Sequence, residues 1–471
     1  MEKHKVAESG YIKENKASLR ELVSKLTEIY GYASALAVDS VARTYRVQRS
    51  GITASDEPML CTRGAVVRVF AGGVLVEYST DEIGFCHNDR IIKEIAALTD
   101  GMERCACPYS ERHCVLDEST EYETDPESLS DKEIIGMLSK ARDKAMSADS
   151  RVFDAALRYS YRKYTKFFCS PTRDMTESIM WSAATVLAMT KNGERIKDSY
   201  KSASGLGGAE IIKALSESKV DEAVACAIDL LDSSPLPAGE YDCICAPDVT
   251  GLIVHEAFGH GVEMDMFVKD RALAEKYVGG RVASSIVCMH DTASGKAQAA
   301  SYFFDDEGNL STDTVIIDRG ILKCGISDAM SAHRTGTLPT GNGRRESFSH
   351  KAYTRMTNTY FEGGDDSLSD MISSIEYGFL LEEARCGMED PKNWGIQCVA
   401  GIAREIKDGE LTGKVYSPAV MSGYVPDLLC SVSMASERVE LFGSGFCGKG
   451  YKEWVKVSDG GPYIKARIKL S

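Results

Sequence analysis

Two histidines and a glutamate lie close together in the segment HEAFGH at positions 255–260 of this 471-residue sequence. In many zinc hydrolases two imidazoles on one helix hold the metal, and a neighbouring glutamate takes a proton from the metal-bound water. The usual spacing of the two histidines is four residues, whereas His255 and His260 are five apart. Five residues turn an ideal α-helix by about 140°, which would point the two rings apart.

Both rings can still meet at one ion if the helix widens by one residue, as a π-helical turn does, or ends nearby. Gly259, just before the second histidine, would ease either change. The alternative is a helix with two core or surface histidines and no metal. Against it, the apolar residues 252–254 bury the start of the helix, so Glu256 is expected in an interior, where a carboxylate needs a partner or a function.

A catalytic zinc ion usually has three protein ligands and one open position. Spacing does not identify the third ligand, and the downstream candidates are Glu263, Asp265, His290, Cys386 and Cys447. Cys447 has the most suggestive setting, because glycines on both sides let the backbone approach a site closely and Lys449 would lower the pKa of its thiol. An ordinary buried cysteine in a turn is the alternative.

A second cluster of possible metal ligands lies in a polar segment of the first half. Cys105, Cys107 and Cys114, with His113, could form a small structural zinc site. The Cys-x-Cys spacing differs from the usual Cys-x-x-Cys, so an exposed loop with reduced thiols is the favoured interpretation.

Two more polar motifs lie in the second half. The segment DDEG at positions 305–308 is acidic enough for calcium, but its glycine followed by asparagine is typical of a hairpin turn. Arg344 and Arg345 either grip a substrate carboxylate through bidentate bonds or belong to a solvated loop, and the sequence leaves both open.

The composition is that of a globular protein, with 43% hydrophobic and 27% charged residues. The net charge of −15 repels phosphate backbones and anionic lipids, so we expect neither nucleic acid nor a membrane as partner. No apolar run reaches the ~20 residues of a transmembrane helix, and the first residues lack the apolar core of a signal peptide. The 15 cysteines, scattered among apolar residues, are typical of a reducing compartment, and we expect a cytoplasmic protein.

Periodicity predicts mixed helices and strands in the first half. Helices are expected over residues 18–30, 91–98 and 209–231. Strands are expected over residues 35–48, 65–78 and 151–168. A Ser-x-x-Glu capping box at Ser130 starts another helix, and the polar residues 101–126 are typical of an exposed loop or a local insertion.

The strongest linker signal is the segment SSPLPAG at positions 233–239. We expect a boundary there, between an N-terminal α/β domain of residues 1–232 and a β-rich domain of residues 240–471. Short β-like runs dominate the second half, for example residues 314–323 and 415–421. One helix near residues 249–264 stands apart and carries the HEAFGH segment.

The segment GLIVHEAFGHGVEMD at positions 251–265 resembles the signature of the TldD proteins, in the TldD/PmbA family of metalloproteases. The resemblance continues in order through FDDEG at 304–308, TGNGRRE at 340–346, RMTNTY at 355–360 and CGK at 447–449. It spans most of the second half, whereas the first half resembles the family only in length and in its helix–strand pattern.

The resemblance implies both a fold and a chemistry. The family fold is α+β, with an N-terminal domain of helices on a sheet and a C-terminal domain of large curved sheets that carries the metal-motif helix. The implied activity is that of a zinc peptidase in which His255, His260 and Cys447 bind Zn²⁺ and Glu256 is the general base. The implied substrates are short or unfolded peptides, including leader segments removed from modified peptides, and an extended peptide could add to an exposed strand edge.

The resemblance also implies a partner. Members of this branch pair with a PmbA-type (TldE) subunit that lacks the metal motif, so a heterodimer with such a subunit, or a homodimer, is expected. Glu263 and Asp265 are candidates for orienting the imidazoles, with solvated acids at a helix end as the alternative. The chain departs from the family pattern after CGK and at residues 386–394, which flank the site and bear on substrate and partner choice.

Two other functions remain open at this level. Cys447 could act as the nucleophile of a cysteine hydrolase with His255 or His260 as base, although Glu256 would then have no purpose. A non-catalytic modulator or binding subunit is the other, since part of the family has carried a DNA-gyrase-modulator label. The chain retains every group that the metal site requires, and its charge argues against direct DNA contact.

Overall fold

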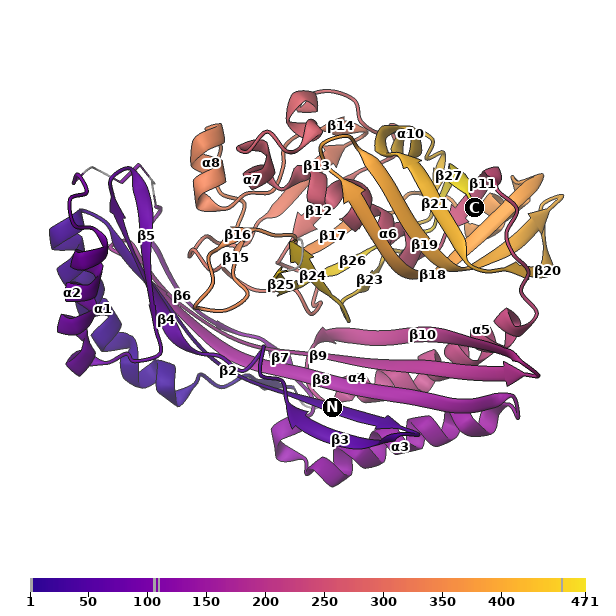
Figure 1. Cartoon of the computed structure of the whole chain (residues 1–471), viewed down its shortest axis with the longest axis horizontal. Helices are drawn as coiled ribbons and strands as arrows, with labels where there is room; N and C mark the ends of the chain where they lie inside the picture. Colours follow the sequence, from indigo (N-terminus) through magenta and orange to yellow (C-terminus); the bar gives the residue numbers. More distant parts are fainter. Residues whose placement is uncertain (1–2, 105–106, 109–110, 450–451) are drawn as a thin grey trace.

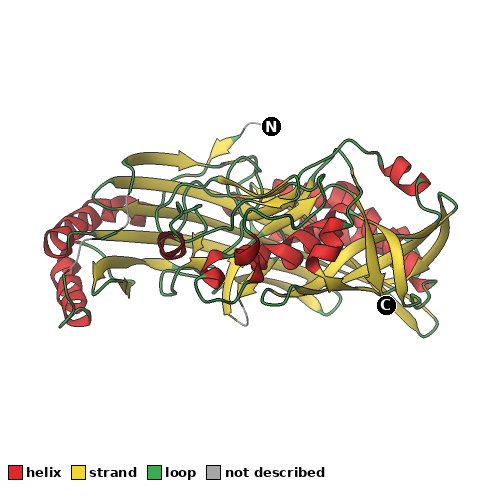
Figure 2. Cartoon of the chain, turned by 90° about the horizontal axis from the view of Figure 1, so that it is seen from above, coloured by secondary structure: helices red, strands yellow, loops and turns green. Residues whose placement is uncertain are grey.

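A computed structural model describes residues 3–104, 107–108, 111–449 and 452–471. A long curved sheet and its helices make up the first half of the chain, and several smaller sheets make up the second (Figure 1). From above, the molecule is elongated along the strands of the first sheet (Figure 2). The expected α+β class, with helices on a sheet in the first half and a β-rich second half, is confirmed.

The first sheet has eight strands, six of them in the order β10-β9-β8-β2-β4-β5, with β3 paired to β2 and β6 to β9. Its strands are β2 (Ala33–Gln48), β3 (Gly51–Asp56), β4 (Arg63–Ala71), β5 (Val74–Thr80), β6 (Cys114–Ser119), β8 (Val152–Cys169), β9 (Arg173–Asn192) and β10 (Arg195–Leu206). The strands expected at 35–48 and 151–168 are confirmed. The one expected at 65–78 is a hairpin that turns at Gly72 and Gly73, both with positive φ.

Helices cover the side of this sheet that faces away from the second half (Figure 1). They are α1 (Gly10–Tyr30), α2 (Asn88–Leu98), α3 (Asp131–Ala148), α4 (Glu210–Ala214) and α5 (Val220–Leu231). A π-helical stretch, Leu215–Lys219, joins the last two. The predicted helices are confirmed, and Ser130 caps α3 in a capping box with Glu133.

The expectation of a loop over residues 101–126 is wrong in part. β6 pairs in parallel with β9, and β7 (Glu121–Tyr122) pairs with β1 (His4–Lys5). β6 leaves much of its surface to solvent, with Val115 71% exposed. A strand so exposed can carry polar residues at most positions, which is why its composition resembles that of a loop.

In the second half, a seven-stranded sheet runs in the order β11-β18-β19-β21-β27-β22, and β20 pairs with β19. Because β11 also pairs with β27, five of these strands close into a barrel. The strands are β11 (Gly239–Cys245), β18 (Tyr377–Asp390), β19 (Gly395–Lys407), β20 (Glu410–Tyr416), β21 (Ala419–Tyr424), β22 (Met434–Ala435) and β27 (Ile464–Leu470).

A six-stranded sheet lies beside the barrel, in the order β14-β13-β12-β17-β26-β23. Its strands are β12 (Met289–Thr292), β13 (Asp313–Asp318), β14 (Ile321–Leu322), β17 (Asn358–Phe361), β23 (Glu440–Phe442) and β26 (Ser458–Gly461). Two small hairpins complete the strands: β15 (Gly343–Arg344) with β16 (Tyr353–Thr354), and β24 (Phe446–Lys449) with β25 (Lys452–Lys456). The β-structure expected at 314–323 and 415–421 is confirmed, the latter divided between β20 and β21.

The second half contains more helices than expected. Besides α6 (Pro247–Leu252), which begins the HEAFGH helix, it has α7 (Met264–Phe267), α8 (Ala329–Thr335), α9 (Leu368–Ser373) and α10 (Val425–Cys430). The expectation of one isolated helix is therefore wrong, because segments this short span too few turns for a 3.6-residue pattern to show. Among the described residues, no helix is long and apolar enough to span a membrane.

The two halves meet through small apolar clusters and buried ion pairs. Lys166 Nζ on β8 lies 2.9 Å from Asp306 Oδ1, and Arg68 Nη1 on β4 lies 2.8 Å from Glu307 Oε1. In the linker, Ser234 forms an isolated β-bridge with Tyr416. The domain limits at 1–232 and 240–471 stay a prediction.

Candidate metal centre

The HEAFGH segment lies in a helix whose hydrogen bonding changes along its length. After α6, Ile253–Gly259 forms a π-helical turn, and His260–Val262 forms a 3-10 turn. A π-helix bonds each residue to the fifth one along, so residues five apart lie on one face. The widening that the five-residue spacing required is confirmed.

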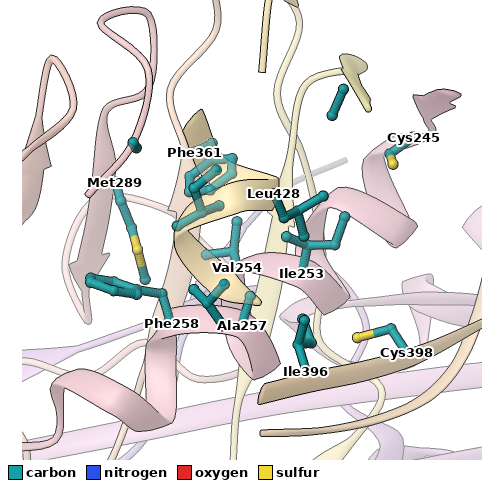
Figure 3. Close-up of a cluster of buried hydrophobic side chains, with 14 of the residues drawn as sticks. Cys245, Ile253, Val254, Ala257, Phe258, Met289, Phe361, Ile396, Cys398 and Leu428 are labelled. Carbon is teal, nitrogen blue, oxygen red and sulfur yellow. The ribbon is translucent and has the colours of Figure 1, made fainter. Parts of the chain in front are cut away.

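Core packing holds this turn in place. Figure 3 shows Ile253, Val254, Ala257 and Phe258 among apolar side chains from the surrounding strands and α10. Gly259 has an ordinary helical φ of −60°, so the expected need for its conformational freedom is wrong. What matters is the missing side chain, since a Cβ would lie 2.3 Å from Met356 Sδ.

The structure brings His255, His260 and Cys447 together. Cys447 Sγ, on β24, lies 3.2 Å from His255 Nε2 and 3.3 Å from His260 Nε2. The two imidazole rings are 5.1 Å apart and nearly perpendicular, at 86°. In the described part of the chain, this is the one group of three or more His, Cys, Asp or Glu side chains whose ligand atoms converge, all within 4.8 Å.

The geometry of this group fits zinc. Zn–N and Zn–S bonds of about 2.0 and 2.3 Å at tetrahedral angles place nitrogen and sulfur ligands roughly 3.5 Å apart, close to the separations seen here. Two imidazoles and a thiolate suit zinc better than magnesium or calcium. Three protein ligands also leave a fourth position for water or substrate, as in catalytic sites.

The three side chains of this group influence one another's protonation states. Burial raises the pKa of the Cys447 thiol, but His255 and His260 outweigh burial and lower it to about 4. Burial lowers the pKa of each histidine, but nearby negative charge outweighs burial. Cys447 raises the pKa of His255, and Glu263 together with Cys447 raises that of His260. The sulfur is therefore a thiolate, the form that binds metals.

Carboxylates face the outer ring nitrogens. His260 Nδ1 lies 3.4 Å from Glu263 Oε2, and His255 Nδ1 lies 3.8 Å from Asp459 Oδ2 without a hydrogen bond. Such carboxylates orient metal-binding imidazoles. Sequence reasoning anticipated Glu263 but missed Asp459, which comes from β26 far along the chain. Asp265 contacts Lys449 instead.

Lys449 does not act on the thiol as expected. Its Nζ lies 2.6 Å from Asp265 Oδ1 and 3.0 Å from Glu263 Oε2. Burial raises the pKa of Glu263, but Lys449 and His260 outweigh it and keep the pKa well below the usual range. Lys449 thus keeps the carboxylate under His260 charged.

Arg355 secures the hairpin that carries Cys447. Its buried guanidinium donates from Nη2 to the Cys447 carbonyl at 2.7 Å and from Nη1 to the Glu453 carbonyl. Its Nε also lies 3.6 Å from Glu263 Oε1. The RMTNTY segment contained this residue, but nothing in the spacing indicated its role.

Glu256 is half-buried beside β18. A Cβ added to Gly387 would lie only 2.7 Å from Glu256 Cγ and 2.9 Å from Cys398 Sγ. With the residues that the structure describes, the Glu256 carboxylate makes no hydrogen bond and no ion pair. The prediction of an interior position is thus right in part, and the carboxylate is free to act on a bound molecule.

The other ligand candidates lie elsewhere. His290 is held by Asp313, at 2.9 Å from its Nδ1, and by Glu362, at 3.1 Å from its Nε2. Cys386 is exposed on β18. Cys105 lies outside the described residues, so neither the alternative of a second zinc site with Cys107 and Cys114 nor the favoured loop with reduced thiols is tested.

The remaining polar motifs have structural partners. Asp305 Oδ1 accepts the backbone N–H groups of Glu307 and Asn309, and Gly308 has φ of 79°, which confirms the turn. Arg345 is buried in an ion pair with Glu77, so a solvated loop is the wrong interpretation for it.

A cavity of about 590 Å³ lies beside the centre, between β10, α6, β18 and β26. Its wall includes Asp459, the carboxylate next to His255, together with Tyr200, Lys201, Asp248 and Ser444. It is large enough for several peptide residues.

Comparison with known proteins places the second half of the chain. Residues 238–468 match the model of the PmbA/TldA metallopeptidase C-terminal domain. A metalloprotease of Methanothermobacter thermautotrophicus is 32% identical over 283 residues, 59% of this chain and 61% of that protein. A zinc metalloprotease TldD homolog of Saccharolobus solfataricus is 32% identical over 241 residues, 51% of this chain and 53% of that protein. The chain thus spans about half to three-fifths of these relatives.

Solved structures share the fold over nearly the whole chain. TldE from Thermococcus kodakarensis is 18% identical, with a TM-score of 0.76 over 96% of this chain and 100% of that one. A Thermotoga maritima protein with a DNA-gyrase-modulator label gives a TM-score of 0.78 at 16% identity, over 97% of this chain and 100% of that one. By its matching domain and its TldD-like relatives, the second half of the chain belongs to the TldD/PmbA family.

Proposed function

We propose that this chain is a zinc-dependent peptidase that hydrolyses peptide bonds in short or unfolded peptides. The observation that carries the proposal is the convergence of His255 Nε2, His260 Nε2 and Cys447 Sγ beside a free Glu256 carboxylate. The metallopeptidase description of the matching domain and the metalloprotease names of the relatives agree with it.

In this proposal the chain's own groups divide the work. Bound zinc supplies a Lewis acid for the scissile carbonyl and lowers the pKa of water to about 7. Glu256 accepts a proton from the attacking water and delivers it to the leaving amine. Asp459 and Glu263 hold the imidazoles in place, and Arg355 fixes the cysteine hairpin.

An unpaired strand edge supports binding of an extended peptide. β18 pairs with β11 only from Gly378 to Leu381, and beyond that it pairs only with β19 among the described strands. On this stretch Gly387 lies against Glu256, because a Cβ there would be 2.7 Å from Glu256 Cγ. A peptide added there would be held by its backbone, so cleavage is expected to depend little on side-chain identity.

Metal content and one conservative variant test the proposal. Untagged protein purified without chelator or added zinc is expected to hold about one zinc per chain by elemental mass spectrometry. Glu256→Gln should keep the zinc and lose about 10²–10⁴-fold in kcat on an unfolded peptide. The exposed Glu410→Gln is the control and should change neither. A folded protein that rejects added zinc would overturn the proposal.

A cysteine hydrolase is the second candidate, because the Cys447 thiolate lies within 3.3 Å of both imidazoles. Thiol alkylation would inactivate either enzyme, so it does not separate the two. Chelation does: a cysteine hydrolase keeps its activity in zinc-free protein. The idle Glu256 carboxylate favours the metallopeptidase.

The family resemblance also suggests a partner subunit and a use for the activity. We propose a PmbA/TldE-type partner subunit, or a second copy of the chain, and removal of leader segments from modified peptides as one use of the activity. Co-purification of the chain with such a subunit, measured by light scattering against the chain alone, separates a heterodimer from a homodimer. A cytoplasmic location stays a prediction.

A further inference from the structure

The hairpin that carries Cys447 is a small sheet of its own. Among the described strands β24 pairs only with β25, and the two lie on the side of the second half that faces the long sheet (Figure 1). A two-stranded hairpin alone is marginally stable in water at best. Metal sites hold their ligand distances to within about 0.2 Å. Contacts from outside the hairpin must therefore fix the Cys447 thiolate within reach of the two histidines.

One set of contacts comes from within the second half, where Arg355 donates to the Cys447 and Glu453 carbonyls. The chain enters β24 through residues 443–445, in which a glycine lies on each side of Ser444. Because glycine adopts many backbone conformations, such a segment takes its course from the groups that hold it. Several of these groups belong to the first half of the chain.

Two hydrogen bonds join this segment to β10 of the first sheet. Tyr200 donates from its hydroxyl to Ser444 Oγ at 3.0 Å. Ser204 Oγ accepts the backbone N–H of Gly443 at 2.8 Å. Both bonded residues of the segment come shortly before Cys447 in the chain, so a shift of the segment also moves the ligand.

Ser204 belongs to a short chain of hydrogen bonds that reaches the same segment twice. Its Oγ donates to Gln298 Oε1 at 3.3 Å, and Gln298 Nε2 donates to the Leu441 carbonyl at 3.2 Å. The space around Gly443 is also filled, since a Cβ there would lie 2.5 Å from Ser458 Oγ. Residue 443 is therefore both hydrogen-bonded and enclosed.

Tyr200 is itself anchored to the second half. Its backbone N–H donates to Glu383 Oε1 at 2.9 Å, and the Ser199 hydroxyl donates to Glu383 Oε2 at 2.7 Å, where Glu383 is buried on β18. On β9, the Trp181 ring meets the Phe446 ring edge-on, with ring centres 6.0 Å apart. The first sheet thus contacts three of the four residues that precede the ligand.

We propose that Tyr200 and Ser204 are positioning residues for the metal centre, which act through residues 443–444 to set where the Cys447 thiolate meets the ion. The first half of the chain thereby takes part in metal binding, although the three ligands all come from the second half. The inference rests on the proposed zinc centre. Loss of either hydroxyl frees the segment before Cys447 but leaves the histidine helix packed in its apolar core. The bond between metal and thiolate is therefore the one that weakens.

Titration of the full chain with Co²⁺ tests this role, because a thiolate ligand gives bound cobalt a charge-transfer absorption in the near ultraviolet. Tyr200→Phe and Ser204→Ala should each weaken Co²⁺ binding about tenfold or more and reduce this absorption at saturation. Tyr159→Phe is the matched control and should bind as the wild type does. Its hydroxyl lies 3.1 Å from Ser182 Oγ, on the helix-covered side of the same sheet. Circular dichroism checks that each variant is folded.

A double-mutant cycle separates positioning from a general loss of stability. Because Tyr200 acts through Ser444, Tyr200→Phe combined with Ser444→Ala should bind Co²⁺ no more weakly than the weaker of the two single variants. Losses that multiply in the double variant overturn the inference, as do wild-type affinity and absorption in both Tyr200→Phe and Ser204→Ala. Unaffected variants overturn this inference alone, whereas a folded wild type that binds neither Co²⁺ nor Zn²⁺ overturns the peptidase proposal with it.

Discussion

At the scale of residues, the centre depends on groups that set one another's charge. Two histidines keep Cys447 a thiolate, Glu263 and Asp459 face the outer nitrogens of those histidines, and Lys449 keeps Glu263 charged. Removing one member therefore changes the others. Glu256 stands outside this set of contacts, as a group that acts on a transient molecule should.

The carboxylate behind His255 gives a prediction about zinc affinity. Asp459→Asn keeps the size of the side chain but weakens its hold on Nδ1 of His255, so zinc affinity should fall about 10–100-fold. Competition with a chelator of known affinity measures this. Glu440→Gln, in the wall of the same 590 Å³ cavity, is the control and should leave affinity unchanged. Equal affinity of Asp459→Asn and wild type would show that the 3.8 Å contact has no orienting role.

Lys456 gives a prediction about pH. Burial, and to a smaller extent Arg158, lowers its pKa to about 7 in the folded chain, whereas an unfolded lysine has a pKa of about 10.4. The unfolded chain therefore binds the proton more tightly between these values, and folding stability falls as the pH drops from 10.4 to 7. In urea unfolding, the free energy of unfolding of the wild type should fall by up to about 1.4 kcal/mol for each pH unit of acidification, relative to that of Lys456→Met. If the free energies of unfolding of the two proteins depended on pH in the same way, this prediction would be wrong.

At the scale of elements, the π-helical turn and β18 cooperate. The turn lets residues 255 and 260 share a face, and the strand brings its backbone against Glu256 because residue 387 has no side chain. The geometry thus depends on two close approaches of backbone to side chain, at Gly387 and at Gly259. The helix at Gly259 is packed in the apolar core, which limits relaxation there, whereas Cys386 and Met388 on either side of Gly387 are exposed.

A methyl group at the strand tests this fit. Gly387→Ala would place Cβ 2.7 Å from Glu256 Cγ and should displace the carboxylate, with kcat reduced at least tenfold. Zinc content should be unchanged, because the ligands lie elsewhere. Gly423→Ala, at a strand position with nothing within 4 Å of the new Cβ, is the matched control. Full activity of Gly387→Ala would mean that Glu256 moves aside without consequence.

At the scale of the whole molecule, buried ion pairs hold the two halves together. Glu77 of β5 receives Arg345 from the second half and Arg68 from its own sheet, while Arg68 also reaches Glu307. Apolar side chains cross this boundary in small clusters, namely Phe168 with Phe304, Ile179 with Tyr302, and Leu230 with Ile402 and Val415. Charge therefore contributes much of the contact near the site.

Removal of Glu77 should be costly. Glu77→Gln leaves Arg345 buried without its partner, so the free energy of unfolding should fall by about 3–5 kcal/mol in urea. Burial raises the pKa of Glu77, but Arg68 and Arg345 outweigh it and lower the pKa to about 2. The wild type should therefore lose this stabilisation as the pH falls from about 4.3 to 2, and the variant should not. The exposed Glu410→Gln should behave as the wild type does.

Much of this arrangement could be predicted from the sequence, and the residues that sequence reasoning missed were missed for one reason. Periodicity gave the long helices and strands, and the His255–His260 spacing required the wider turn that is present. Cys447 followed from family resemblance, not from spacing. Asp459 and Arg355 were missed because they reach the centre from separate strands and loops, and no local pattern marks which distant residue a fold will bring near.

The long separation between the ligands has a consequence for synthesis. Cys447 follows His255 by 192 residues, and those residues include most of the barrel that supports the helix. A ribosome that has just completed the HEAFGH segment has therefore made neither the third ligand nor the strands that hold it. At about 5–20 residues per second, ten seconds or more pass before the thiol exists. If the chain is the peptidase proposed above, it cannot assemble its active centre while it is still unfolded and is itself the nearest peptide.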